Sequence, residues 1–311
     1  MNMKTVYLNK FMSSVVAELE MNGQYGTAHV CGSVLRSVMA FGGEGLPVSG
    51  ITPLWLKAYE GYLLHKGGKG LAWNTVSTYM RMLQAVYNRA VVRKLAAFIP
   101  HQFRDVFTGR KADHRRVLER DDMQKLLVER DPDITSPGMA WARACLELMF
   151  RFHGMPFVDL AHLRKSDLKD GYLTLRRRKT GMPLSARVDG RAMQLLERYR
   201  NRDDTSPYLL CFLDGNLEGM AAYRDYQRIL RLLNSRLRAL ALWKKVQGKV
   251  TSYSARHTWA TVGRYCHIPI EVISEGLGHA SVTTTEGYMK GFGNSRMDRA
   301  NKVIMNYIFK G

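Results

Sequence analysis

The chain has 311 residues, of which 46% are hydrophobic, and its 47 lysines and arginines exceed its 27 acidic residues to give a formal net charge of +20. This length and apolar content suffice for two domains with their own cores and exclude a chain that is disordered throughout. An excess of positive charge this large indicates a polyanionic partner, most commonly nucleic acid, because lysine and arginine release the counterions that condense on phosphates. A basic protein without such a partner is the alternative at this stage.

The cysteines and the hydropathy pattern bear on the kind of protein and on its cellular compartment. The four cysteines, Cys31, Cys145, Cys211 and Cys266, are far apart and form no C-x-x-C pair, so neither a zinc site nor a disulfide framework is predicted. The first twenty residues lack the uninterrupted apolar stretch of a signal peptide, and no later run of about 18 apolar residues is present to span a bilayer. We therefore expect a cytoplasmic protein.

The first hundred residues predict a helical bundle. Helical patterns run to about residue 21, through TAHVCGSVLRSVMAF, from Pro53 onward with Thr52 as the N-cap, and through NTVSTYMRMLQAVYNRAVVRKL. The last of these helices has an apolar face and an opposite basic face suited to a phosphate backbone. Its basic residues are Arg81, Arg89, Arg93 and Lys94. A solvated charged face explains any single one of them equally well.

Residues 101–118 are basic, polar and weakly periodic, which predicts an interdomain linker able to cross DNA. Helical patterns resume beyond it and are interrupted by GYLTLRRRKTGMPLSARV, where apolar residues flank Thr180 and Gly181 on both sides. That stretch predicts a β-hairpin with its tip near these two residues. The expected organisation is a helical domain over residues 1–100, the linker over 101–118 and a second domain over 119–311.

Four segments of the second half carry side chains suited to a phosphodiester. They contain Lys179 in RRRKTG, Arg256 and His257 in SARHTWAT, His279 in LGHASVTTT, and Tyr288 nine residues later. Cations hold the charge of a phosphate, histidine carries protons near neutral pH, and a tyrosine hydroxyl can act as a nucleophile. No cluster of carboxylates accompanies them in the sequence, which argues against a nuclease that holds two metal ions.

The order of these motifs resembles a known family. K-T-G, then A-R-H-T-x-A-T, then L-G-H followed nine residues later by Tyr288 is similar to the catalytic domain of the tyrosine recombinase (phage integrase) family. The stretch NTVSTYMRMLQAVYNRAV resembles the last helix of that family's core-binding domain, so the resemblance covers nearly the whole chain. It implies a mainly α, multidomain fold, with an N-terminal helical (SAM-like) core-binding domain and a C-terminal α+β catalytic domain that holds a small β-sheet.

The resemblance also implies a role for each of the four principal residues. Tyr288 would attack a DNA phosphate and displace the 5′ hydroxyl, leaving a 3′-phosphotyrosyl link that conserves the energy of the bond. Arg256 would grip the non-bridging oxygens, and Lys179 would protonate the leaving oxygen. His279, with a pKa near neutrality, would hydrogen-bond the phosphate or move the proton of the nucleophile. No metal and no nucleotide cofactor is implied.

Further residues are expected to support these four. In this pattern His257 is expected to be a buried, hydrogen-bonded support, and Asp159 in FVDLAHL is expected to be a structural acid that orients neighbouring arginines. The basic run Arg176, Arg177 and Arg178 precedes the lysine and is expected to contact the DNA backbone.

Two positions depart from the family's pattern. Where the family usually has a histidine three residues before its second catalytic arginine, this chain has Tyr253, whose hydroxyl can donate a hydrogen bond but does not exchange protons near pH 7. Where the family has its first catalytic arginine, two residues after a helix-ending glycine, this chain has Pro156 after Gly154. Either the first arginine has been lost or a nearby cation replaces it, with Arg151 as the first candidate and His153 as the second.

The leading interpretation is a site-specific recombinase that integrates, excises or inverts DNA of a mobile element. Its partner would be double-stranded DNA with paired recombination sites. Because two strands are exchanged at each of two sites, a homo-tetramer is expected on the DNA, formed from chains that are monomeric or weakly associated when free. Such an enzyme would act in the cytoplasm on the bacterial nucleoid. The alternatives are a degenerate site-specific DNA-binding protein on the same scaffold and a type IB topoisomerase that relaxes DNA as a monomer.

Overall fold

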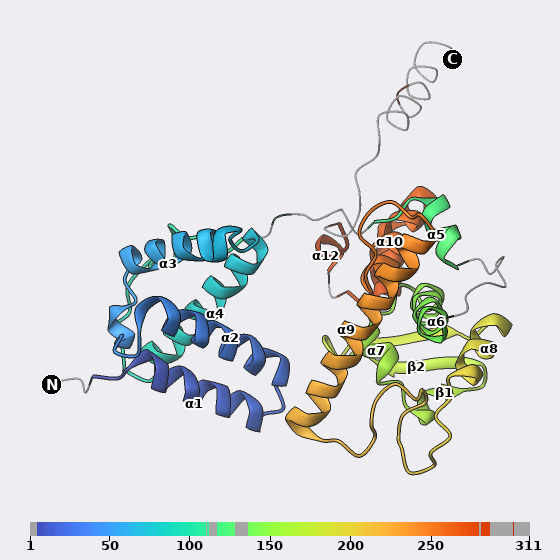
Figure 1. Ribbon diagram of the computed structural model, residues 1–311, viewed down its shortest axis with the longest axis horizontal. Helices are drawn as coiled ribbons and strands as arrows, with labels where there is room; N and C mark the ends of the chain where they lie inside the picture. Colours follow the sequence, from blue (N-terminus) through green and yellow to red (C-terminus); the bar gives the residue numbers. More distant parts are fainter. Residues whose placement is uncertain are drawn as a thin grey trace. The chain divides into compact units, whose positions relative to one another are not determined.

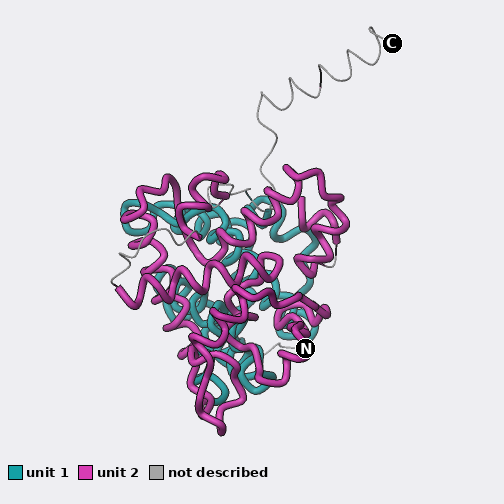
Figure 2. Tube along the Cα trace, turned by 90° about the vertical axis from the view of Figure 1, so that its right-hand side faces the viewer, with its two compact units in different colours: residues 1–112, 218–223 teal, residues 113–217, 224–311 magenta. Residues whose placement is uncertain are grey.

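The computed structural model describes residues 5–109, 111, 117–127, 136–279, 281–286 and 301. The chain divides into two compact units, residues 1–112 with 218–223 and residues 113–217 with 224–311 (Figure 2). Each unit has its own core of buried apolar side chains. The mainly α, multidomain fold with one small sheet that the sequence indicated is confirmed. None of the helices in the described parts of the chain is long and apolar enough to cross a membrane.

The first unit is a helical bundle (Figure 1). Its elements are α1 (Leu8–Met21), α2 (Tyr25–Gly42), the 3-10 turn η1 (Val48–Gly50), α3 (Pro53–His65), the 3-10 turn η2 (Lys66–Gly68) and α4 (Trp73–Val92). The predicted start of the third helix is confirmed, because Thr52 Oγ1 accepts a hydrogen bond of 3.1 Å from the backbone N–H of Trp55 and Pro53 is the first helical residue. The apolar faces of these helices meet in one core.

Part of the expected linker belongs to this bundle. Phe103 and Val106 are buried in its core, and the side-chain amide of Asn74 in α4 exchanges two hydrogen bonds of 2.8 Å with the backbone of Lys111. These residues pack through single apolar side chains and backbone polar groups rather than through a helix, which explains their weak periodicity. The first unit therefore extends past residue 100, where the sequence placed its end.

The second unit combines helices with a small sheet (Figure 1). Its elements are α5 (Arg120–Leu127), α6 (Pro137–Arg151), α7 (Phe157–Ala161), the 3-10 turn η3 (Lys165–Asp167), β1 (Leu168–Lys169), β2 (Tyr172–Arg176), β3 (Pro183–Arg187), α8 (Gly190–Arg198), α9 (Gly219–Trp243), α10 (Ser254–Tyr265), α11 (Ile270–Leu277) and α12 (Val282–Glu286). Helices α10 and α11 pack against each other, and α10 also packs against α6. The core draws on α6, α8, α9 and one face of the sheet.

The sheet is antiparallel with the order β1-β2-β3, and the predicted β-hairpin is confirmed. Leu173 lies opposite Ala186 in the register, and both are buried, as is Leu184 on the same face. The turn places Gly181 at a φ of +70°, a left-handed conformation that glycine adopts without steric cost. Lys179 therefore lies in the turn that joins β2 to β3.

Candidate functional site

Arg256 is held at the junction of two helices and a turn. It lies in the first turns of α10, and its side chain is buried, with 3% of the residue exposed. Its Nη1 donates a hydrogen bond of 3.1 Å to the carbonyl oxygen of Gly154, which follows α6, and its Nη2 donates one of 2.7 Å to the carbonyl oxygen of Leu277 at the end of α11. The same Nη2 lies 2.7 Å from Nε2 of His279. The guanidinium is thereby oriented before any ligand binds.

The contacts of His279 fix its tautomer. A guanidinium N–H can only donate, so Nε2 of His279 accepts from Arg256 and the ring proton is assigned to Nδ1. Nδ1 then donates to Thr285 Oγ1, 2.7 Å away, and Thr285 is fully buried in α12. Burial lowers the pKa of His279 to about 4, and the positive charges of Arg256, Arg177 and Lys179 add to this effect. His279 is therefore neutral at pH 7, in contrast to the near-neutral pKa expected from the sequence.

Two glycines let these segments approach closely. Gly154 has a φ of +66°, and a Cβ atom there would lie 2.9 Å from the Cα atom of Arg256. Gly278 ends α11 in the left-handed conformation, with φ of 62° and ψ of 45°, and a Cβ atom there would lie 2.9 Å from Nη1 of Arg177. Glycine is the residue that meets both demands, a left-handed backbone and the absence of a side chain.

Arg177 is buried, unlike its neighbours in the basic run. It continues the inward-facing positions of β2 beyond Leu173, with 6% of the residue exposed, whereas Arg176 and Arg178 face outward. Its Nε donates a hydrogen bond of 2.8 Å to Oδ2 of Asp159, a residue that is 2% exposed. The expected contacts of these three arginines with a DNA backbone stay a prediction, and Arg177 differs from the other two in being buried.

Asp159 and Leu277 connect this arginine to the rest of the site. Asp159 accepts hydrogen bonds from Arg177 and from the backbone N–H of Arg178, at 2.9 Å, and so ties the hairpin to α7. Nη1 of Arg177 donates to the carbonyl oxygen of Leu277, the atom that also accepts from Arg256. Two buried guanidinium groups thus share one acceptor.

Lys179 is exposed in the hairpin turn. Its charge contributes to the lowered pKa of His279, so its ammonium group lies within electrostatic range of the imidazole. Arg176, on the outer face of the hairpin, donates from Nη1 to the carbonyl oxygen of Gly181 at 3.2 Å. The hairpin thus presents one exposed lysine near two buried arginines and a half-buried histidine.

The two candidates for the missing first arginine lie in other surroundings. Arg151 donates from Nε to Glu147 at 2.9 Å and from Nη1 to Asp189 at 2.6 Å, so two carboxylates already hold its guanidinium. His153 packs its ring 5.6 Å from that of Trp259, and its Nδ1 is buried with no hydrogen-bond partner among the residues that the structure describes. Burial lowers the pKa of His153. The prediction that Arg151 supplies the missing guanidinium therefore conflicts with its ion pairs.

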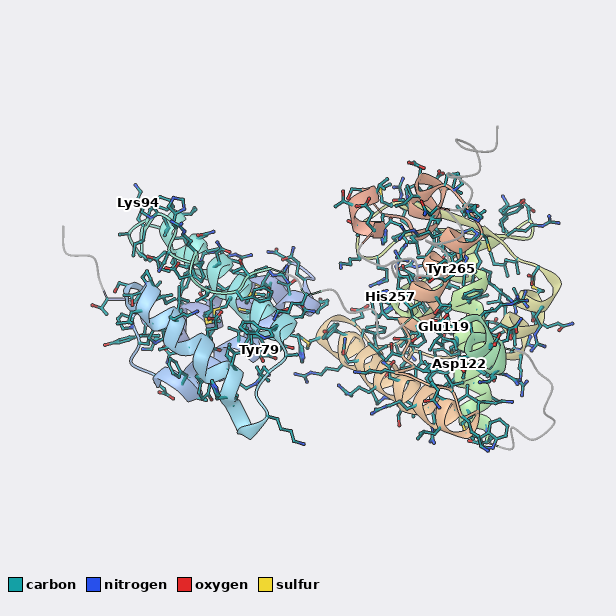
Figure 3. The ribbon with its side chains drawn as sticks, turned by 90° about the horizontal axis from the view of Figure 1, so that it is seen from above. Tyr79, Lys94, Glu119, Asp122, His257 and Tyr265 are labelled. Carbon is teal, nitrogen blue, oxygen red and sulfur yellow. The ribbon has the colours of Figure 1, made fainter. Side chains whose placement is uncertain are left out.

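The remaining expected residues lie as follows. Tyr253, at the residue before α10, is 41% exposed, and its ring lies 6.2 Å from that of His257, which is half-buried on α10 (Figure 3). Tyr288, the expected nucleophile, lies outside the described residues. The part of the chain that is described contains no group of three or more His, Cys, Asp or Glu residues placed to hold a metal ion.

The basic face of the first unit is partly neutralised within the unit. Arg93 donates to both carboxylate oxygens of Glu18 at 2.7 and 2.8 Å, and Arg89 lies 3.7 Å from the same group. The hydrogen bond from Arg93 is the main reason that the pKa of Glu18 is lowered. Arg81 is exposed, and Lys94 is exposed at the C-terminal end of α4 (Figure 3).

Sequence reasoning missed two features of this site. It did not find Thr285, the hydrogen-bond partner of His279 six residues further along the chain, because nothing in a threonine-rich stretch distinguishes one hydroxyl from the next. It also missed the burial of Arg177, although a signal was present. Leu173, Leu175 and Arg177 share one parity in the strand, so period-two alternation directs all three to the same face.

A helical first unit, followed by an α+β unit that gathers arginine, histidine and lysine at a hairpin and two helix ends, is the arrangement of a tyrosine recombinase. The comparisons with known families agree with this class. The phage integrase SAM-like domain matches residues 7–104, and the phage integrase family matches residues 116–292. The chain therefore belongs to the phage integrase family of tyrosine recombinases, and the resemblance drawn from its sequence is confirmed.

Individual relatives share the family at low identity. The tyrosine recombinase XerA of Pyrococcus furiosus is 29% identical over 140 residues, which cover 44% of this chain and 46% of XerA. The chain thus matches about half the length of this curated relative. Lambda integrase, solved as a dimer bound to a COC′ core site, has a TM-score of 0.62 at 17% identity over 93% of this chain and 97% of that chain. The Tn1549 transposon integrase, solved with transposon right end DNA, has a TM-score of 0.64 at 16% identity over 98% of this chain and all (100%) of that chain. These two similarities show the fold.

Proposed function

We propose that this chain is a site-specific recombinase that cleaves and rejoins DNA through a 3′-phosphotyrosyl intermediate, in the integration, excision or inversion of a DNA segment. The observation that carries the proposal is the cluster around His279, where Arg256 is hydrogen-bonded to the imidazole and the charges of Arg177 and Lys179 converge on it. Two buried guanidinium groups and one exposed ammonium group near a neutral histidine suit an anion that gains charge during reaction.

The chemistry of strand cleavage assigns a task to each group. The phenolic oxygen of Tyr288 forms a bond to the phosphorus, and the bond from phosphorus to the 5′ oxygen breaks. The leaving oxygen takes a proton, for which the exposed ammonium group of Lys179 is the proposed donor. Rejoining reverses these steps when the 5′ hydroxyl of another strand attacks the phosphotyrosine. The phosphoryl bond is conserved throughout, so the proposal needs no nucleotide and no metal.

Arg256 and His279 are the proposed phosphate ligands. The charge on the non-bridging oxygens increases in the transition state, and the guanidinium of Arg256, which two backbone carbonyl oxygens hold in place, can stabilise it through bidentate hydrogen bonds. His279 is neutral, and the lone pair on its Nε2 accepts a hydrogen bond from Arg256. A phosphate that draws the guanidinium toward itself would release Nε2 and raise the pKa of the ring, because negative charge favours the imidazolium. His279 can then accept the proton of the nucleophile.

The proposed partner is double-stranded DNA with paired recombination sites. The net charge of +20 and the DNA-bound states in which lambda integrase and the Tn1549 integrase were solved support this partner. Lambda integrase was also solved as a tetramer bound to a Holliday junction. We propose the same stoichiometry here, a homo-tetramer on the DNA, with single chains or weak associations in its absence.

A covalent trapping experiment tests the proposed function. Duplexes that cover the DNA flanking the gene are nicked near each candidate cleavage position, so that cleavage releases a short fragment and cannot be reversed. The wild-type protein should form an adduct that survives denaturing electrophoresis, and Tyr288→Phe should form none. Tyr172→Phe, which removes an exposed hydroxyl on β2, is the matched control and should react as the wild type does.

Pro156 favours one competing function, a degenerate DNA-binding protein on the same scaffold. It stands where the family has a cationic side chain, and it carries neither charge nor donor. Tight site-specific binding by the wild type with no adduct on any nicked duplex would support that function. Relaxation of supercoiled plasmid that contains no specific site would support a topoisomerase.

A further inference from the structure

Pro156 leaves a charge deficit in the proposed site. A phosphodiester under attack carries its charge on two non-bridging oxygens, and one guanidinium, that of Arg256, is already assigned to them. Pro156 is the N-cap of α7, with an extended backbone at φ of −64° and ψ of 148°. Its side chain cannot donate a hydrogen bond, so a second cation has to come from another element.

We infer that Arg177 supplies this second guanidinium, from the end of strand β2 rather than from the start of α7. This inference rests on the proposed recombinase function. Arg177 and Arg256 donate to the same oxygen, the carbonyl of Leu277, so their guanidinium groups are neighbours. Both residues are buried, and both charges lower the pKa of His279. Arg177 therefore occupies the same electrostatic site as the residues assigned to the phosphate.

The contacts of Arg177 place it beside the position of the missing side chain. Its Nε is bound by Asp159, and the backbone N–H of Asp159 donates a hydrogen bond of 3.0 Å to the carbonyl oxygen of Pro156 in the first turn of α7. The guanidinium thus reaches the turn that begins at Pro156 from the hairpin side. Gly278 has no side chain where a Cβ atom would lie 2.9 Å from Nη1 of Arg177, which keeps this path open.

One end of the guanidinium is held and the other is available. Nε and Nη1 are bound by Asp159 and Leu277, whereas Nη2 has no hydrogen-bond partner among the described residues. Fixed orientation with a remaining donor suits a group that receives an oxyanion. In contrast, two carboxylates, on Glu147 and Asp189, already bind Arg151.

A purely structural role is the competing explanation. The buried ion pair between Arg177 and Asp159 joins the hairpin to α7, so loss of the arginine can disturb the site without any contact to phosphate. The two roles differ in their response to the charge of the substrate. A cation that balances a non-bridging oxygen becomes dispensable when a methyl group replaces that oxygen, whereas a structural ion pair is needed for either substrate.

The test compares adduct formation on two nicked duplexes, one with a normal scissile phosphodiester and one with a methylphosphonate at that position. On the phosphodiester, Arg177→Ala should react at least about 100-fold more slowly than the wild type, in the range found when one transition-state donor is removed. On the methylphosphonate, the difference from the wild type should shrink by at least about tenfold. DNA affinity should remain within a few-fold. Arg151→Ala and Arg187→Ala, which removes an exposed arginine of β3, should stay within about threefold of the wild type on both substrates.

The outcomes separate the inference from the proposed function. No adduct from the wild type on either substrate contradicts the recombinase itself. A wild-type adduct combined with an Arg177→Ala rate within about threefold, or with an equal loss on both substrates, overturns the role of Arg177 alone. If Arg151→Ala instead reacts slowly on the phosphodiester and regains the wild-type rate on the methylphosphonate, Arg151 supplies the second guanidinium and the inference is overturned. If Arg177→Ala fails to fold, Arg177→Lys and Arg177→Gln are compared in the same way. Lysine keeps the positive charge and glutamine removes it, so Arg177→Lys should react faster on the phosphodiester. Equal rates for these two variants overturn the inference.

Discussion

The close approach of α6 to α10 makes Gly154 the most informative position for a stability test. In Gly154→Ala the new Cβ atom would lie 2.9 Å from the Cα atom of Arg256, several tenths of an ångström inside the usual carbon contact of about 3.5 Å. The left-handed backbone costs an alanine about 1–2 kcal/mol, and overpacking against backbone atoms adds about 1–3 kcal/mol. The free energy of unfolding of the second unit should therefore fall by about 2–5 kcal/mol.

Gly171→Ala is the matched control for this prediction. Gly171 has a φ of +76° in the same unit, and a Cβ atom there meets nothing within 4 Å. It should therefore lose only the backbone contribution, about 1–2 kcal/mol. Urea denaturation followed by tryptophan fluorescence measures both variants. Equal losses of stability would refute the reasoning, because they would show that the approach of Arg256 to Gly154 imposes no steric constraint.

Three further predictions concern ionisable groups. Asp159→Ala should lower the free energy of unfolding by about 3–5 kcal/mol in urea denaturation, because it leaves Arg177 as a buried charge without its carboxylate; a loss below about 1 kcal/mol would contradict the buried ion pair. The stability contributed by neutral His279 should be complete above about pH 6.5 and decline as the pH falls toward 4, because the imidazole takes up its proton at a higher pH in the unfolded chain than in the folded one. In thermal unfolding, the stability of His279→Gln should therefore decline less steeply over this pH range. Identical declines in the variant and the wild type would contradict the lowered pKa. Glu18→Gln should release Arg93 from its ion pair and so add roughly one phosphate contact to the salt dependence of duplex binding. Fluorescence anisotropy between about 50 and 200 mM salt measures this dependence. An unchanged slope of affinity against salt concentration would exclude the basic face of α4 from DNA binding.

Local patterns in the sequence predicted most of the fold. Thr52 and Pro53 indicated a helix start because capping and a fixed φ act within one turn, and Thr180–Gly181 indicated a hairpin because turn geometry restricts residue choice. The order of Lys179, Arg256 and His279 indicated the site because the spacing of the motifs is specific in combination. These features depend on neighbouring residues or on the linear order of motifs, both of which are visible in a single chain.

Features that depend on packing were not accessible in the same way. The pKa of His279 is set by burial and by charges from two other segments, the hairpin and α10, and the ion pairs of Arg151 depend on Asp189, which is distant in sequence. The threonine-rich run has weak helix propensity, yet residues 282–286 form a short helix in which Thr285 is buried against His279. Tertiary contacts of this kind outweigh local propensity.

The claim that this chain cleaves DNA through a tyrosine is tested most directly by identifying the amino acid joined to the DNA. The adduct formed on a nicked duplex is digested with nuclease and protease, and the modified peptide is sequenced by mass spectrometry. We predict a phosphotyrosyl link at Tyr288 to the 3′ end of the cleaved strand, at the same site in Tyr172→Phe and absent in Tyr288→Phe. Recovery of the link at another residue, or of no linked peptide while the protein binds its site tightly, would contradict it.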